Sequence, residues 1–156
     1  MLSSKRLSRH RRLKPPRPPN YMIELTKKPI SPELVISRVK TGSSGCVATY
    51  VGLIRDNSHG KAVLWVEYKD AGGRAKKGLE QIAIEIRQKW PVNNIAICHR
   101  IGRLKVGDIN FLVAVAAAHR KEGFAACRYG VDRFKELMPT QKIETYTDGS
   151  TSVAAE

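Results

Sequence analysis

The chain has 156 residues, enough for one domain with a hydrophobic core of ordinary size. Its 28 Lys and Arg against 14 Asp and Glu give a formal net charge of +14, which favours an anionic partner. No apolar run reaches the ~18 residues of a membrane-spanning helix, and the three cysteines lack the C-x-x-C spacing of zinc sites. We therefore predict a cytoplasmic protein with reduced thiols and without a metal or bound cofactor.

Half of the excess positive charge lies in residues 1–21, which hold seven basic residues, four prolines and no acid. Such a segment has too few apolar residues to pack, so we predict a disordered tail. Arg and Ser without acids are typical of an organelle transit peptide, but the prolines argue against the amphipathic helix that such peptides form. The simpler alternative is an extension upstream of a natural start at Met22. Residues 22–150 are predicted to form a single domain, and residues 151–156 a flexible C-terminus.

The first half of the domain alternates strand and helix signals. Residues 22–26 have the composition of a short strand. Ser31 and Pro32 fit the N-cap and first turn of a helix that would end near Val39. After a Gly-Ser turn, residues 46–54 and 62–68 are rich in β-forming side chains and predict two further strands.

The second half repeats this alternation. Apolar residues at helical spacing predict a helix that ends at Pro91: Leu79, Ile82, Ala83, Ile86 and Trp90. Residues 94–101 and 110–117 predict strands, residues 119–137 a helix, and residues 143–147 an edge strand. This order predicts an α/β (α+β) sandwich with helices over one face of a mixed or antiparallel sheet.

The most informative segment joins a strand to the last helix. An apolar run at residues 111–118 gives way to His119 and Arg120. Apolar residues then recur at steps of three and four: Phe124, Cys127, Val131, Phe134 and Met138. Two basic side chains at a helix N-terminus oppose the helix dipole, which favours anions there. A phosphate held by Arg120 and the free helix amides would remove this conflict, whereas without a ligand the pair is an ordinary exposed helix start.

Three segments together resemble the family of large, catalytic subunits of molybdopterin synthase. The matching residues are Val51-Gly52-Leu53-Ile54-Arg55-Asp56, then His99-Arg100-Ile101-Gly102-Arg103-Leu104 with Gly107-Asp108, then Ala118-His119-Arg120 and the helix up to Pro139, Lys142 and Glu144. They occur in the family's order between about Gly45 and Gly149. The resemblance implies an α/β hammerhead fold and a homodimer.

The resemblance also implies a reaction, a sulfurtransferase step of molybdenum cofactor biosynthesis. Sulfur from the C-terminal Gly-Gly thiocarboxylate of a small ubiquitin-like carrier subunit would be transferred to cyclic pyranopterin monophosphate, forming the molybdopterin dithiolene. Two carriers would cap the homodimer, giving a heterotetramer. Neither a membrane nor a nucleic acid is an expected partner.

The same resemblance implies roles for particular residues. Lys135 would be the principal acid/base group, and Lys142 the second, gripping the carrier's tail. The substrate would be bound by Arg55, His119 and Arg120 together with Leu53, Ile54, Ile143 and Glu144. No cysteine nucleophile is required.

Simpler interpretations of these residues stay open. Lys135 and Arg128 project from nearly the same face of the last helix and could form a solvated basic stripe paired with Asp132. Arg55 could pair with the neighbouring Asp56. His99 is interpreted as a partly buried structural histidine with satisfied hydrogen bonds, and Arg100 as a surface arginine.

Two other classes of function stay open as well. Gln141 and Ile143 replace an aromatic residue and a second lysine of the family, which would fit an inactive paralogue that binds the carrier. The net charge alone would fit a basic RNA- or ribosome-binding protein. Aromatic residues are only 6% of the chain, however, and Trp65, Trp90, Phe124 and Phe134 are predicted to be core rather than stacking platforms.

Overall fold

The computed structural model describes residues 21–155, so residues 1–20 of the predicted tail and residue 156 lie outside the described part. Its elements, in chain order, are β1 (Tyr21–Thr26), α1 (Pro32–Val39), β2 (Cys46–Leu53), β3 (Asn57–Ser58), β4 (Lys61–Lys69), α2 (Ala75–Lys89), β5 (Val92–Arg100), β6 (Gly102–Lys105), β7 (Ile109–Ala117), α3 (Arg120–Leu137), β8 (Gln141–Tyr146) and β9 (Thr151–Ala155). The first strand thus begins at Tyr21, one residue before the predicted boundary.

Four strands form the larger sheet, in the order β1-β5-β7-β2. β1 is parallel to β5, and the other two pairs are antiparallel, so the sheet is mixed as predicted. Successive residues of β7 point to opposite faces. Val113 and Val115 pack with α2 and α3 on one face, and Leu112 and Ala114 pack beneath α1 on the other.

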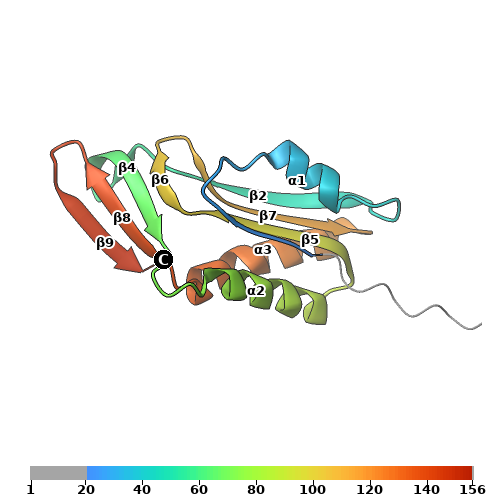
Figure 1. Ribbon diagram of the computed structural model, residues 1–156. Helices are drawn as coiled ribbons and strands as arrows, with labels where there is room; N and C mark the ends of the chain where they lie inside the picture. Colours follow the sequence, from blue (N-terminus) through green and yellow to red (C-terminus); the bar gives the residue numbers. More distant parts are fainter. Residues whose placement is uncertain (1–20, 156) are drawn as a thin grey trace, which may run out of the picture.

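The helices therefore cover both faces of this sheet, α1 on one side and α2 with α3 on the other (Figure 1). This corrects the prediction that all helices lie over one face. The first helix begins as predicted, with Pro32 in its first turn and the Ser31 side chain accepting a hydrogen bond from the Leu34 amide. No helix within residues 21–155 is both long and apolar enough to span a membrane.

A second sheet stands at one end of the first (Figure 1). It has five strands, but most of them are short, so we call it the smaller sheet. It has the order β3-β4-β8-β9, and β6 also pairs with β4. Its own core is a compact set of buried side chains: Ile54, Val63, Val66, Tyr68, Leu104 and Tyr146. The sequence does not predict the short strands β3 and β6, because they are only 2 and 4 residues long.

The C-terminal segment corrects two predictions. Residues 151–156 are predicted to be flexible, but Thr151–Ala155 forms β9 and pairs with β8. β8 is consequently an interior strand between β4 and β9, not the predicted edge strand. The connection is a tight turn in which Gly149 has φ 85° and Asp148 accepts a hydrogen bond from the Ser150 amide. Asp-Gly is a typical hairpin signal and could have revealed β9.

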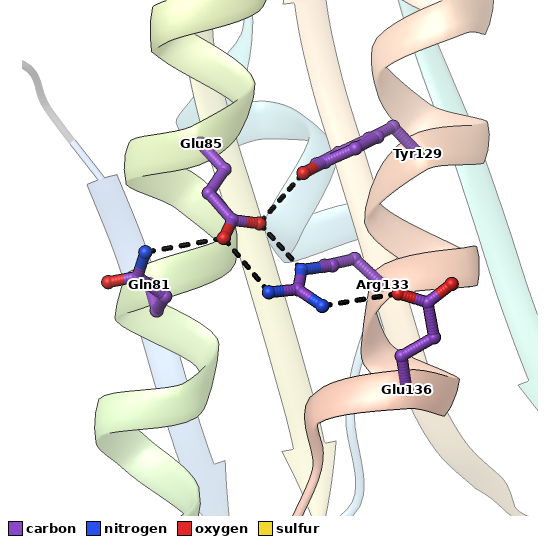
Figure 2. A network of polar contacts seen from close by, with 5 residues as sticks. All are labelled: Gln81, Glu85, Tyr129, Arg133 and Glu136. Carbon is purple, nitrogen blue, oxygen red and sulfur yellow. Dashed lines mark hydrogen bonds and ion pairs between the residues drawn. The ribbon is translucent and has the colours of Figure 1, made fainter.

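A polar network joins α2 to α3 (Figure 2). Glu85 accepts hydrogen bonds from Arg133 Nε at 2.9 Å and Nη2 at 3.2 Å, and from the Tyr129 hydroxyl at 2.8 Å. Gln81 donates to the same carboxylate, and Arg133 also pairs with Glu136. The hydrogen bonds from Arg133, with those from Tyr129 and Gln81, outweigh partial burial and lower the pKa of Glu85 to about 2. The network fixes the two helices against each other on their outer side.

Candidate active site

A cavity of about 270 Å³ lies where the larger sheet, the end of α3 and the smaller sheet meet. Six of the residues predicted from the sequence line it: Leu53, Ile54, Arg55, Lys135, Lys142 and Glu144. They come from three distant parts of the chain, namely the end of β2, the last turn of α3 and strand β8. The fold therefore brings together the two predicted catalytic lysines and one of the three predicted anion-binding residues.

Packing beneath the cavity determines where Lys135 lies. Its neighbour Phe134 is fully buried and stacks on Phe111 of β7, with the ring centroids 3.7 Å apart. On its other side, Phe134 meets the edge of the buried His99 ring. Because these contacts fix the rotation of the last turn of α3, Lys135 is carried to the cavity wall as an exposed side chain.

An ion pair forms another part of the cavity wall. Lys142 Nζ lies 3.0 Å from Glu144 Oε1, and the Tyr146 hydroxyl donates to Glu144 Oε2 at 2.6 Å. Burial opposes ionisation of Glu144, but hydrogen bonds from Tyr146, Ser58 and Lys142 outweigh it and lower its pKa to about 2. Glu144 is therefore a carboxylate at neutral pH and holds the Lys142 ammonium in place. Ile143 lies between them on the strand, points to the other face and does not line the cavity, contrary to its predicted place in the site.

A second cavity of about 260 Å³ adjoins the first and shares Arg55, Ser58, Lys142 and Glu144 with it. His59 and Ser152 complete its polar wall. His59 has a backbone φ of 53°, in the left-handed region that residues other than glycine rarely adopt. The Lys142–Glu144 pair thus stands between two spaces, each large enough for part of a ligand.

His119 and Arg120 lie elsewhere in the chain. Both are exposed at the start of α3, where His119 is the N-cap residue without a side-chain capping bond. Lys135 is at the other end of this helix, roughly 20 Å away at 1.5 Å per residue. Within one chain they cannot share a pocket with Lys135 and Arg55.

The structure also decides two of the simpler interpretations and one prediction about the core. Arg128 and Asp132 form an exposed ion pair at 3.6 Å, as the local interpretation predicts. His99 is fully buried, with Nδ1 2.9 Å from the Asn110 carbonyl oxygen, which confirms its structural interpretation. Phe124 is predicted to be core but is 68% exposed. Helical spacing gives its direction only approximately, and it falls at the edge of the buried stripe.

The cysteines do not take part in the site. Cys98 and Cys127 are buried, and burial raises the pKa of Cys98 to about 12 and that of Cys127 to about 11. Cys46 is half-buried near the start of β2. A thiol with such a raised pKa is a poor nucleophile at neutral pH.

Sequence reasoning missed several residues of the cavity wall, among them Tyr50, Tyr68 and Asn110. Of these, only Asn110 could have been singled out from the sequence, because it is a polar residue directly before the apolar run of residues 111–118. Tyr50 and Tyr68 have no comparable signal, since tyrosine is common in any half-buried strand.

Comparison with known proteins shows which family the chain is similar to. Residues 25–137 match the family described as "MoaE protein". The molybdopterin synthase catalytic subunits of Halalkalibacterium halodurans and a Nostoc species are similar to the chain. The first is 37% identical over 80% of this chain and 80% of its own length, and the second 41% identical over 82% and 78%.

Two comparisons with solved structures extend this result to three dimensions. Molybdopterin synthase from Staphylococcus aureus superposes with a TM-score of 0.80 at 33% identity, over 86% of this chain and 97% of the other. A complex of subunits 1 and 2 of the molybdopterin-converting factor from Helicobacter pylori gives a TM-score of 0.67 at 15% identity, over 87% and 90%. The second comparison shows the fold alone.

Proposed function

Because this chain belongs to the MoaE family of molybdopterin synthase catalytic subunits, we propose that its 270 Å³ cavity is where sulfur is transferred. Membership of the family makes the chain a sulfurtransferase of molybdenum cofactor biosynthesis. We assign the site to this cavity because it is lined by Lys135, Lys142 and Arg55 together. Three cationic side chains suit a phosphorylated pterin and an anionic thiocarboxylate.

The two lysines have different surroundings and hence different roles. Lys142 is held by Glu144, so its position is fixed and it serves to bind the negatively charged end of the sulfur donor. No carboxylate among residues 21–155 lies within ion-pair distance of Lys135, which is therefore our candidate for moving protons at the reacting carbon and sulfur. The neighbouring cavity gives the donor's C-terminal tail a route to Lys142.

The sulfur donor would be a small carrier subunit with a C-terminal Gly-Gly thiocarboxylate. The Helicobacter pylori protein of the same fold is seen in a complex of two subunits, which supports a two-subunit enzyme. We place the reaction in the cytoplasm, where thiols stay reduced. Gln141 and Ile143, the residues that depart from the family, do not line the cavity, which favours an active enzyme over an inactive paralogue.

A homodimer would complete the site. β2 is an edge strand, paired only with β7 among the described residues, and large apolar side chains are exposed on and beside it: Tyr50, Val51, Leu53 and Phe124. An unpaired apolar edge tends to pair with another chain. A second copy related by a two-fold axis would add its own β2 in antiparallel orientation.

That arrangement would join the separated halves of the site. The Cys46 end of β2 lies beside Ala117, just before His119, and the Leu53 end leads to Arg55. Antiparallel pairing of two β2 strands places the first end of one copy beside the second end of the other. The His119 and Arg120 side chains of the second copy would then approach Arg55 and Lys135, and two carriers would make a heterotetramer.

The function is tested by mixing the purified chain with thiocarboxylated carrier and cyclic pyranopterin monophosphate, and measuring the dithiolene product. Lys135→Ala should abolish product formation. Lys121→Ala removes an exposed lysine at the other end of α3 and is the matched control for the loss of one positive charge. The thermal unfolding midpoint and the mass of the dimer, measured for both variants, show whether each one folds and assembles. Near-normal product formation by Lys135→Ala would overturn the assignment.

The shared site is tested by mixing two inactive variants. In a mixed dimer of Lys135→Ala and Arg120→Ala chains, one site receives both alterations and the other receives neither. Random exchange of equal amounts makes about half of the dimers mixed, and one of the two sites in each mixed dimer is intact. The mixture should therefore recover about a quarter of wild-type activity. If each site were built from a single chain, every site would keep one alteration and mixing would restore nothing.

A further inference from the structure

We propose that Asn110 is a specificity-determining residue that binds the pterin ring through its side-chain amide. This inference rests on the proposed function, because it places the pterin in the cavity with Lys135. The direction of the side chain, its one hydrogen-bond partner and its unpaired oxygen support this role.

A β-bulge aims Asn110 at the cavity. β2 pairs Gly52 with Phe111 and Leu53 with Ile109, so Asn110 is the additional residue on β7. With regular alternation it would point with Leu112 toward α1. Instead it lines the cavity beside Phe111 and Phe134. Bulges often re-aim a side chain next to an active site.

One end of the amide is anchored and the other is not. Asn110 Nδ2 donates to the Tyr68 hydroxyl at 3.0 Å, which sets the orientation of the amide. Asn110 is only 8% exposed, and its Oδ1 has no hydrogen-bond partner among residues 21–155. A buried carbonyl oxygen without a partner is unfavourable, because it has lost its hydrogen bonds to water. A ligand that supplies an N–H would remove this penalty.

Gly52 is the neighbour that this oxygen requires. A Cβ at position 52 would lie only 2.8 Å from Asn110 Oδ1, so any other residue would press on it. Gly52 lines the same cavity as Asn110. A reduced pterin has N–H donors along one ring edge, and Oδ1 accepts hydrogen bonds only. The amide therefore selects a heterocycle with an N–H edge, independently of the phosphate.

The test separates ring binding from phosphate binding and from catalysis. Asn110→Leu keeps the size of the side chain and removes the acceptor. With the natural carrier, its KM for cyclic pyranopterin monophosphate should rise at least about tenfold while kcat stays within about twofold. Inhibition by inorganic phosphate, which interacts with the cationic residues, should be unchanged, as should carrier binding.

A conservative variant tests the direction of the hydrogen bond. Asn110→Asp keeps an acceptor and loses the donor but adds a negative charge, so its KM should rise less than that of the leucine variant, and inhibition by inorganic phosphate measures the effect of the charge. If Asn110→Asp raised KM as much as the leucine variant does while phosphate inhibition stayed unchanged, the amide would act as a donor and the assignment of Oδ1 would be wrong. Should the leucine variant fail to fold, Asn110→Ala should still raise KM about threefold or more.

The outcomes distinguish this inference from the function on which it rests. An active wild-type enzyme with an unchanged KM in Asn110→Leu or Asn110→Ala would overturn the role of Asn110 alone. A wild-type chain that neither binds the pterin nor forms dithiolene would overturn the proposed site and the inference together.

Discussion

The Glu85 network predicts a measurable loss of stability when it is removed. Glu85→Ala deletes two hydrogen bonds from Arg133, one from Tyr129 and one from Gln81. Hydrogen bonds to charged groups contribute about 1.5–3 kcal/mol each when well shielded. The Glu85 and Arg133 side chains are 15% and 30% exposed, so water replaces part of each bond. We therefore expect a loss of about 2 kcal/mol in the free energy of unfolding, or about 6 °C in Tm for a domain of this size.

The same reasoning gives a pH dependence. The pKa of Glu85 is lowered from 4.5 to about 2 in the folded chain, so its contribution is fully present above pH 4.5 and is lost as the pH falls toward 2. The full shift would correspond to about 3 kcal/mol at 1.36 kcal/mol per pKa unit, and partial exposure reduces this to about 2 kcal/mol. The stability difference between wild type and Glu85→Ala should therefore shrink across this window.

Chemical denaturation at a fixed protein concentration, repeated between pH 7 and pH 3, measures this difference. Glu80→Ala, at an exposed position on the same helix, is the matched control and should change stability by less than about 0.5 kcal/mol. A Glu85→Ala loss that matched the control, or one that stayed constant down to pH 3, would refute this account of the network.

Three further outcomes are expected. Lys142→Ala should lower kcat at least about tenfold and Lys142→Arg less, because arginine can still pair with Glu144; equal loss in both would contradict the proposed tail-binding charge. Iodoacetamide at pH 8 should leave Cys98 and Cys127 unmodified in the folded chain, because burial raises their pKa values to about 12 and 11, and should label both after denaturation. Mass spectrometry that detected label on either cysteine of the folded chain would contradict this. Deleting residues 1–20 should leave turnover unchanged and weaken retention on a polyanion column, because the segment carries seven basic residues; a tenfold loss of turnover would show that the tail serves the reaction.

The sequence predicted the longer elements well because their periodicity is strong. The strands around residues 94–101 and 110–117 and the helix after His119 appear within about two residues of their predicted bounds. Periodicity reports only that one side of an element is buried, however, and not which face of a sheet it covers. The place of α1 opposite α2 and α3 could not be predicted for that reason.

The candidate site was predictable in part. Arg55, Lys135 and Lys142 were identified by their resemblance to family motifs, and the fold brings them into one cavity. The separation of His119 from Lys135 follows from the length of one helix, so it could have been foreseen at 1.5 Å per residue. Asn110 could be noticed as a polar residue directly before an apolar run, but its direction could not be predicted, because a bulge that the sequence does not reveal turns it toward the cavity.

The division of the molecule into separate cores has a consequence for the order in which it unfolds. The smaller sheet has its own limited core, while the larger sheet is packed on both faces. Regions with fewer buried apolar contacts open at lower free energy and form separate cooperative units, visible as faster amide hydrogen exchange. Lys142 belongs to the weaker unit and Lys135 to the stronger one. Warming should thus separate the two lysines, and stop sulfur transfer, while most of the backbone remains folded.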